Sequence, residues 1–410
     1  MSARDVIANL RELADLTSTP DGAQRLAWGP VWREARHWFN GKLAVLGITP
    51  EIDAAGNSWA TLRGASDRTV IIGSHLDSVP NGGWLDGALG VMAGYEALRM
   101  FKDQRPPLTI KVVDWADEEG ARFGRSLLGS SAAAGALKIG EVEHLVDKDG
   151  TRLVDALREN GVELTRMHQS QAFLTAIDAA AYLELHIEQG PVLEAMNTPT
   201  GVVLGTFGVE RHLLRFTGQA AHSGSTPIPM RRDAFLAAAE SALAFREIAK
   251  GHTTPDARVV CTVGTVKVEP GIVTAVPGAC EISLDQRALD APVLASMLKD
   301  ARAAASRAAQ NNNVSVEWRH VWQIDPRPFD PRLIQLCAEA VREVTGEAPH
   351  LPSGPLHDAA EMVPHMPTVM MFAYSSNGLS HCKEEDTPGP HLEKSITAFL
   401  RLVEKVVEGA

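Results

Sequence analysis

The sequence predicts an α/β domain with a mixed central sheet and helices on both faces, interrupted by a smaller α+β sandwich domain. Short apolar runs alternate with helical patterns in the first half of the chain and again near its end. Between about residues 210 and 330 the pattern changes to a β-α-β-β-α-β order. A length of 410 residues also favours two domains, because one compact core rarely serves so long a chain.

Four apolar runs predict the strands of the larger domain. Thr69–Ser74 (TVIIGS) and Leu108–Asp114 (LTIKVVD) flank a helical pattern at Gly90–Phe101. The runs Tyr182–Ile187 and Thr368–Ala373 predict two more strands of the same sheet. Each run ends beside polar residues, which makes these strand ends candidate positions for a functional site.

Helices are expected in two further stretches of this domain. Gly129–Ala180 is rich in alanine and mostly helical in pattern, with a turn at Lys148–Gly150. The final stretch, 391–409, should cover one face of the sheet, because its apolar residues recur at helical spacing: Ile396, Phe399, Leu400, Leu402, Val403 and Val406.

The inserted segment has an order of elements that can form its own core. It comprises a strand at 212–220, an Ala-rich helix at 233–249, strands at 257–268 and 280–288, a helix at 292–309 and a strand at 314–322. We therefore expect the larger domain to consist of 1–210 and 329–410, with 211–328 inserted between them.

Composition and charge exclude several functions. The chain has 51 acidic residues against 39 Lys and Arg, a net charge of −12, and no basic cluster that could follow nucleic-acid phosphates. We find no signal-peptide core and no apolar run of the roughly 18 residues that a membrane span needs. The four cysteines are scattered and form no CxxC pair. We expect a reduced, cytoplasmic protein that binds neither nucleic acid nor membrane.

A metal-binding pattern follows the first predicted strand, in GSHLDSVPNGGWLDGALG. His75 and Asp86 offer an imidazole nitrogen and a carboxylate oxygen, which suit a divalent transition metal such as zinc. Asp77 could accept a hydrogen bond from the other ring nitrogen of His75 and so fix its tautomer. The alternative is an ordinary turn whose polar residues are solvated.

Three consecutive acids, Asp117, Glu118 and Glu119, follow the next strand. Such a run is most often a solvated helix N-terminus, where the helix dipole favours negative charge. Adjacent carboxylates also point in different directions, so one can bind a metal ion while the other accepts a proton from water. Hydrolytic metal sites need both functions.

Histidines stand at two further strand ends, His186 in YLELHIEQGP and His381 in NGLSHCKEED. Each alone is more often an ordinary surface or core histidine. Their shared setting favours a site, because ligands in open α/β sheets bind at the carboxyl ends of the strands.

The inserted segment and the last part of the chain carry further candidates. His222 lies in a polar turn and Arg287 at a strand end, where such residues are usually solvated. A hydrolase of acidic substrates would, however, need an oxyanion donor and a guanidinium group for a carboxylate. His357 and Asp358 follow a turn at Gly354 and could shape a substrate pocket.

Together these motifs resemble the dinuclear metal-dependent amidohydrolases, which include N-carbamoyl-L-amino acid hydrolases, β-ureidopropionases and allantoate amidohydrolases. The resemblance runs from about Ala14 to the C-terminus. In ELHIEQGP, histidine stands where peptidase relatives carry an acid, which favours the carbamoylase and ureide branch. The motifs that carry it are GSHLDSV, GGWLDGALGV, DEEGARF, ELHIEQGPVLE, AHSGSTP, SGPLHDA and GLSHCKEE.

The resemblance implies two divalent metal ions per subunit. Asp86 would bridge them. His75 and His186 would complete the ligand set of one ion, and Glu119 and His381 that of the other. Zinc is the first expectation, although manganese, cobalt and nickel accept the same ligands.

The resemblance also implies catalytic and substrate-binding residues. Glu118 would be the general base, with Asp77 beside the metal ligands. The inserted domain would be a lid and would also form the interface of a homodimer. His222 would stabilise the oxyanion, and the resemblance leaves open whether it acts in its own subunit or across the dimer. The expected substrate contacts are Gln189, Arg287, Thr274, Gly354 and His357.

Two departures from the family pattern leave the substrate open. Gly271 and Thr274 stand at the positions where many members carry asparagine, and Pro355 and Leu356 replace small residues before His357. The first expectation is an N-carbamoyl-amino acid amidohydrolase that releases an amino acid, CO2 and ammonia. The alternatives are an allantoate or ureidoglycolate amidohydrolase, an N-acyl-amino acid hydrolase or peptidase, and an inactive dimeric scaffold. The complete set of candidate ligands and Glu118 argues against the inactive scaffold.

Overall fold

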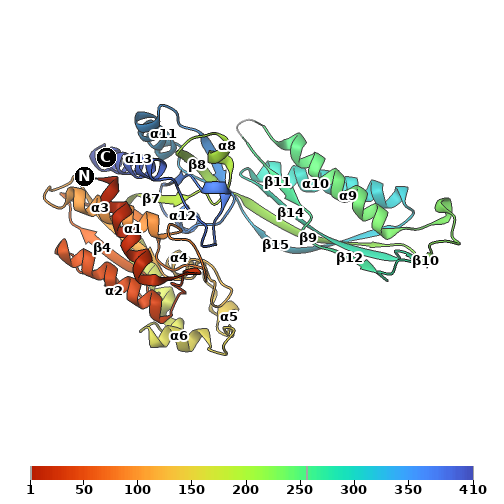
Figure 1. Ribbon diagram of the computed structural model, residues 1–410, viewed down its shortest axis with the longest axis horizontal. Helices are drawn as coiled ribbons and strands as arrows, with labels where there is room; N and C mark the ends of the chain where they lie inside the picture. Colours follow the sequence, from red (N-terminus) through yellow and green to blue (C-terminus); the bar gives the residue numbers. More distant parts are fainter. Residues whose placement is uncertain (1, 255–256, 410) are drawn as a thin grey trace. The chain divides into compact units, whose positions relative to one another are not determined.

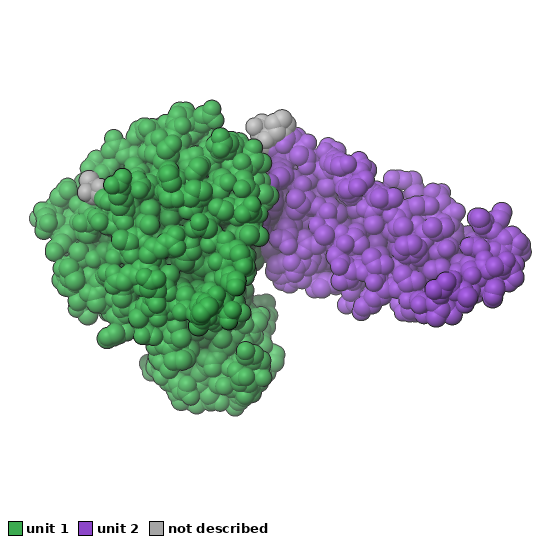
Figure 2. Space-filling model, viewed as in Figure 1, with its two compact units in different colours: residues 1–204, 329–351, 355–410 green, residues 205–328, 352–354 purple. Residues whose placement is uncertain are grey.

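The computed structural model describes residues 2–254 and 257–409, which divide into two compact units (Figure 2). Unit 1 comprises the residues up to 204, 329–351 and those from 355 onwards. Unit 2 comprises 205–328 and 352–354. Among the helices of the described ranges, none is both long and apolar enough to cross a bilayer.

Seven strands of the mixed sheet in unit 1 follow the order β8-β18-β7-β5-β6-β4-β3, and β17 (His350–Ser353) also pairs with β8. The inner strands β18, β7, β5 and β6 are parallel, whereas β8, β4 and β3 run antiparallel to their neighbours. The predicted mixed α/β architecture and its four strands are confirmed. The strands are β3 (Glu51–Ile52), β4 (Ser58–Leu62), β5 (Ser66–His75), β6 (Leu108–Trp115), β7 (Ala179–Ile187), β8 (Thr200–Thr206) and β18 (Thr368–Ala373).

Helices cover both faces of this sheet. Successive strand residues point to opposite faces, so Ile72 packs into the core on one face and Ile71 into the core on the other. This explains why the centre of β5, Val70–Ile72, is a continuous apolar run. The helices on the Ile72 face are α1 (Ala3–Thr17), α2 (Pro30–Val45), α3 (Ala88–Phe101), α11 (Pro331–Thr345) and α13 (Gly389–Glu408).

The C-terminal helix α13 buries the apolar side chains that the sequence predicted, from Ile396 to Val406. The stretch 128–175 is mostly helical, as expected, with a turn at Lys148–Gly150, but it forms short helices that glycines interrupt. The short helices of unit 1 are α4 (Leu128–Ala133), α5 (Ile139–Val142), α6 (Leu153–Glu159), η1 (Leu164–Gln169), α7 (Ser170–Thr175), α8 (Val192–Ala195), α12 (Asp358–Met362) and η3 (Ser376–Gly378).

Unit 2 is an antiparallel sheet of order β11-β14-β9-β15, with β12 also paired to β14. Helices α9 and α10 lie side by side along one face (Figure 1), where Phe216, Phe245 and Ala301 share a buried core. The elements are β9 (Gly208–Thr217), β10 (Ala221–His222), α9 (Ala234–His252), β11 (Val260–Thr262), β12 (Val266–Glu269), β13 (Ala275–Val276), β14 (Ala279–Ala288), α10 (Ala291–Asn311), β15 (Ser315–Ile324) and β16 (Arg327–Pro328).

The strand expected at 257–268 is divided into β11 and β12. Between them, the hydroxyl oxygen of Ser283 accepts hydrogen bonds from the backbone of Gly264 and Thr265, both at 3.0 Å. A side chain thus takes the place of a ladder partner and breaks the strand. The lid and dimer roles of this region remain predictions.

Candidate metal centre

The predicted metal ligands of unit 1 meet at one edge of the sheet. Because the inner strands are parallel, their carboxyl ends lie together. His75 is the last residue of β5, and His186 is the next-to-last residue of β7. Glu119 follows β6, and His381 follows β18. Asp86 comes from the loop between β5 and α3.

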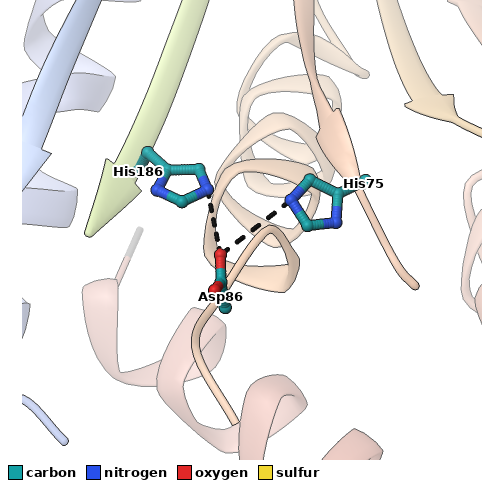
Figure 3. A group of neighbouring side chains, drawn as sticks. All are labelled: His75, Asp86 and His186. Atoms are coloured by element: carbon teal, nitrogen blue, oxygen red, sulfur yellow. Dashed lines mark ion pairs between the residues drawn. The ribbon is translucent and has the colours of Figure 1, made fainter. Parts of the chain in front are cut away.

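The carboxylate of Asp86 faces two groups of ligands. Oδ1 lies 3.1 Å from His186 Nε2 and 3.9 Å from His75 Nε2, and both imidazole rings point toward it (Figure 3). Oδ2 lies 3.3 Å from His381 Nε2, which is also 3.4 Å from Glu119 Oε2. Asp86 thus belongs to both groups, each of which has its donor atoms within 4.8 Å.

Both histidines of the first group present Nε2 to the centre because Nδ1 is engaged elsewhere. The Nδ1 atom of His75 lies 3.1 Å from the backbone oxygen of Asp77, and that of His186 lies 2.9 Å from the backbone oxygen of Ile187. A carbonyl only accepts, so Nδ1 carries a proton in both rings, and Nε2 is the nitrogen that can bind a metal ion once it has lost its own proton. The partner of His75 is therefore the Asp77 main chain rather than its carboxylate, which lies 3.5 Å away.

The Asp77 carboxylate instead holds the acidic loop. It accepts hydrogen bonds from the backbone nitrogens of Glu118 at 3.3 Å and Glu119 at 3.1 Å. The alternative of a solvated helix N-terminus is wrong for this loop, because Asp117 and Glu118 are buried and the next helix begins only at Leu128.

Glu118, the expected general base, lies beside the first group of candidate ligands. Its Oε2 atom lies 3.6 Å from His75 Nε2. Burial raises the pKa of Glu118 well above its usual value, and the charges of Asp358 and Glu119 add to the rise, while the charge of His75 opposes it. A raised pKa suits a carboxyl group that takes up and returns a proton.

The pKa values of the other two acids of the centre, Asp86 and Glu119, shift in opposite directions. Hydrogen bonds from His186 and His381 outweigh burial and hold the pKa of Asp86 well below its usual value. Burial and the charge of Asp86 raise the pKa of Glu119 to about 7. Asp86 is therefore the acid that stays ionised most readily.

The residues present fit divalent cations. The donor set combines imidazole nitrogen with carboxylate oxygen, as zinc, manganese, cobalt and nickel accept. The ring of His357 lies 4.4 Å from that of His186, and its buried Nε2 atom has no hydrogen-bond partner. Burial lowers the pKa of His357 well below its usual value, so this ring is neutral beside the centre.

One predicted substrate contact, Gln189, also lies at the centre. Its Nε2 atom donates to Asp86 Oδ2 at 2.9 Å and lies 3.2 Å from His381 Nε2. The amide therefore touches the same carboxylate oxygen as the second ligand group.

Unit 2 holds the remaining predicted residues in two pairs. His222 is exposed, and its Nδ1 atom accepts from the backbone of Gly224 at 3.1 Å, which leaves the proton on Nε2. Thr274 lies beside it, where its carbonyl accepts from the backbone of Ser223 at 2.9 Å. Arg287 donates from Nη1 to the carbonyl of Gly354 at 3.0 Å.

Sequence reasoning missed several buried charged residues around the centre. Glu385 accepts from the backbone of Asp86, and Glu184 accepts from the Tyr182 hydroxyl and the backbone of Ala359. Arg25 is fully buried and donates to the carbonyl of Leu76 at 2.7 Å. Glu184 and Glu385 lie inside the quoted motifs ELHIEQGP and NGLSHCKEED, whereas no pattern marks Arg25.

Comparisons with known proteins match nearly the whole chain. The model of the peptidase family M20/M25/M40 matches residues 71–405. The N-carbamoyl-L-amino acid amidohydrolase of Geobacillus stearothermophilus is 35% identical over 92% of this chain and 91% of its own. The allantoate amidohydrolase of Escherichia coli is 32% identical over 89% of this chain and 88% of its own. A putative amidohydrolase/peptidase structure from Burkholderia cenocepacia has a TM-score of 0.91, 29% identity and 100% coverage of both chains.

Proposed function

Because this chain belongs to peptidase family M20/M25/M40, we propose that it is a metal-dependent hydrolase of linear carbon–nitrogen bonds that acts on N-carbamoyl-L-amino acids. The observation that carries the proposal is the Asp86 carboxylate, whose two oxygens face separate groups of ligands with Glu118 beside them. The 35% identical Geobacillus relative bears the name of this activity, which supports the substrate class.

We propose that the centre would hold two divalent ions, with Asp86 as a ligand of both. Zinc is the first expectation for their identity. His75 and His186 would complete one site, and Glu119 and His381 the other. When bound, such ions supply Lewis acidity that polarises a carbonyl group and makes water more acidic. Of these side chains, His75, Asp86 and His186 are buried, whereas His381 is half exposed.

Glu118 carries the proton in this proposal. It accepts a proton from the attacking water and returns it to the nitrogen that leaves, while hydroxide adds to the ureido carbon and the carbon–nitrogen bond breaks. The products are the free amino acid and carbamate, which decomposes to CO2 and ammonia.

Arg287 is the proposed partner of the substrate carboxylate. A guanidinium group has five N–H donors. The Nε and Nη2 atoms of Arg287 face the Asp285 carboxylate at 2.9 and 3.4 Å, and Nη1 donates to Gly354. These contacts fix the plane of the group and leave two donors for a ligand. Gln189, Thr274 and His357 are the other proposed substrate contacts.

His222 is the proposed oxyanion donor, because its Nε2 proton is directed away from the turn that holds Nδ1. We further propose a homodimer through unit 2. Helix α9 exposes Leu236 by 47% and Leu243 by 60%, and the loop before β13 exposes Ile272 by 59% and Val273 by 99%. Exposed apolar groups of this kind favour an interface.

Allantoate is the second candidate substrate, because the Escherichia coli relative is named for it and shares 32% of aligned residues. An N-acyl-amino acid substrate would need the same centre and would release no ammonia.

The proposal is tested by stripping the protein with a chelator and titrating metal back while following both bound metal and amide hydrolysis. We expect activity to return in proportion to the bound metal and to reach its maximum at two ions per chain. Full activity in the stripped protein would contradict the proposal.

A further inference from the structure

We propose that Glu385 is a positioning residue that sets the orientation of Asp86 and ties it to the chain segment that carries His381. The inference rests on the proposed ligand set and adds to it a side chain that touches neither substrate nor metal.

One oxygen of Glu385 fixes the main chain of the Asp86 loop. The side chain is buried, and Oε1 accepts hydrogen bonds from the backbone nitrogens of Leu85 at 3.1 Å and Asp86 at 3.0 Å. A buried backbone N–H that is left without an acceptor costs free energy, so these two bonds hold the loop in place. The direction in which the Asp86 side chain leaves the loop is therefore set by this carboxylate.

The other oxygen of Glu385 binds the segment that carries His381. Oε2 accepts from the Ser380 hydroxyl at 2.8 Å, and the same hydroxyl lies 3.1 Å from Asp86 Oδ2. Ser380 directly precedes His381 in the chain. Glu385 thus joins two segments nearly 300 residues apart in sequence, and these segments supply the shared ligand and a ligand of the second group.

Gly83 provides the space for this carboxylate. A Cβ atom at position 83 would lie 2.1 Å from both Cδ and Oε1 of Glu385. Any side chain there must displace Glu385, because the backbone bonds of the carboxylate leave it no free direction. Gly83→Ala therefore moves Glu385 while keeping its chemistry, which separates position from charge.

Glutamine should replace Glu385 almost fully. Its amide oxygen can still accept from Leu85 and Asp86, and its NH2 group can donate to the Ser380 oxygen. Alanine removes every one of these contacts. A purely electrostatic role would instead make Glu385→Gln as damaging as Glu385→Ala.

The test measures Co²⁺ affinity by competition with a chromophoric chelator, together with the visible absorption spectrum of the Co²⁺ protein. We expect Glu385→Ala and Gly83→Ala to weaken binding by roughly 10–100-fold and to change the spectrum, as loss of such outer contacts generally does. Glu385→Gln should stay near wild type. Glu384→Ala, which removes the exposed neighbouring carboxylate, is the matched control and should change nothing. When Glu385→Ala and Gly83→Ala are saturated with metal, their kcat should fall while KM stays unchanged.

Wild-type Co²⁺ affinity and an unchanged spectrum in Gly83→Ala or Glu385→Ala would overturn the inference. So would equal losses in Glu385→Gln and Glu385→Ala. If Glu385→Ala does not fold, Gly83→Ala and Glu385→Gln still decide between these outcomes. A wild-type chain that binds no metal would overturn the proposed function itself, a result distinct from unchanged binding in the variants.

Discussion

The metal-free protein should become more stable as the pH falls from 8 to 6, because burial and neighbouring negative charges make carboxyl groups of the centre costly to ionise. Burial and the charge of Asp86 raise the pKa of Glu119 to about 7. An acid with a raised pKa in the folded state stabilises the fold when protonated, and this stability is lost as the pH rises through that value. Lowering the pH from 8 to 6 across a pKa near 7 adds about 1.4 kcal/mol from Glu119 alone.

The assay is urea unfolding in the presence of a chelator at pH 8, 7 and 6. Tryptophan fluorescence reports mainly on unit 1, which holds six of the eight tryptophans. Glu119→Gln should reduce the gain between pH 8 and 6 by about 1.4 kcal/mol. Glu384→Gln changes an exposed acid and should leave the gain as in the wild type.

Adding metal should reverse the trend. Ligands must be deprotonated to bind a cation, so the loaded protein should be more stable at pH 8 than at pH 6. A metal-free protein whose stability stays constant or falls from pH 8 to 6 would refute the reasoning, as would an equal gain in Glu119→Gln.

Three substitutions test the other assigned roles. Glu118→Gln should keep its metal by elemental analysis and lose roughly 10²–10⁴-fold in turnover, since it removes only the proton acceptor; near-normal turnover would exclude Glu118 as the base. Asp86→Ala should lose metal, because one carboxylate serves both ligand groups, and an unchanged metal content would contradict a bridging role. Leu243→Glu places a charge on the exposed face of α9 and should give monomers in sedimentation equilibrium; a persistent dimer would place the interface elsewhere.

The fold could be predicted where the sequence pattern reflects burial on both faces of a strand. Val70, Ile71 and Ile72 are fully buried because β5 lies between two parallel strands with helices on either side. The same parallel order brings His75 and His186 to one edge, so their meeting follows from topology. Gly87 is needed there for a local reason, since a Cβ atom would lie 2.4 Å from the ring of His75.

Other features could not be predicted because they depend on single side chains far apart in the chain. Glu385 belongs to a charged run that looks solvated, yet it is buried against the Asp86 loop. Asp77 was expected to orient His75 through its carboxylate, but the carboxylate binds the backbone of the acidic loop. Trp28 is likewise explained only by the fold, because its indole N–H donates to Asp117 at 2.7 Å.

Ammonia release by the metal-loaded protein tests the central claim most directly. The panel pairs N-carbamoyl-L-amino acids with the matching N-acetyl amino acids and adds N-carbamoyl-β-alanine, allantoate and ureidoglycolate. We predict ammonia and free amino acid in equal amounts from the N-carbamoyl-L-amino acids. Release of amino acid from the N-acetyl compounds, with no ammonia from any ureido compound, would contradict the account.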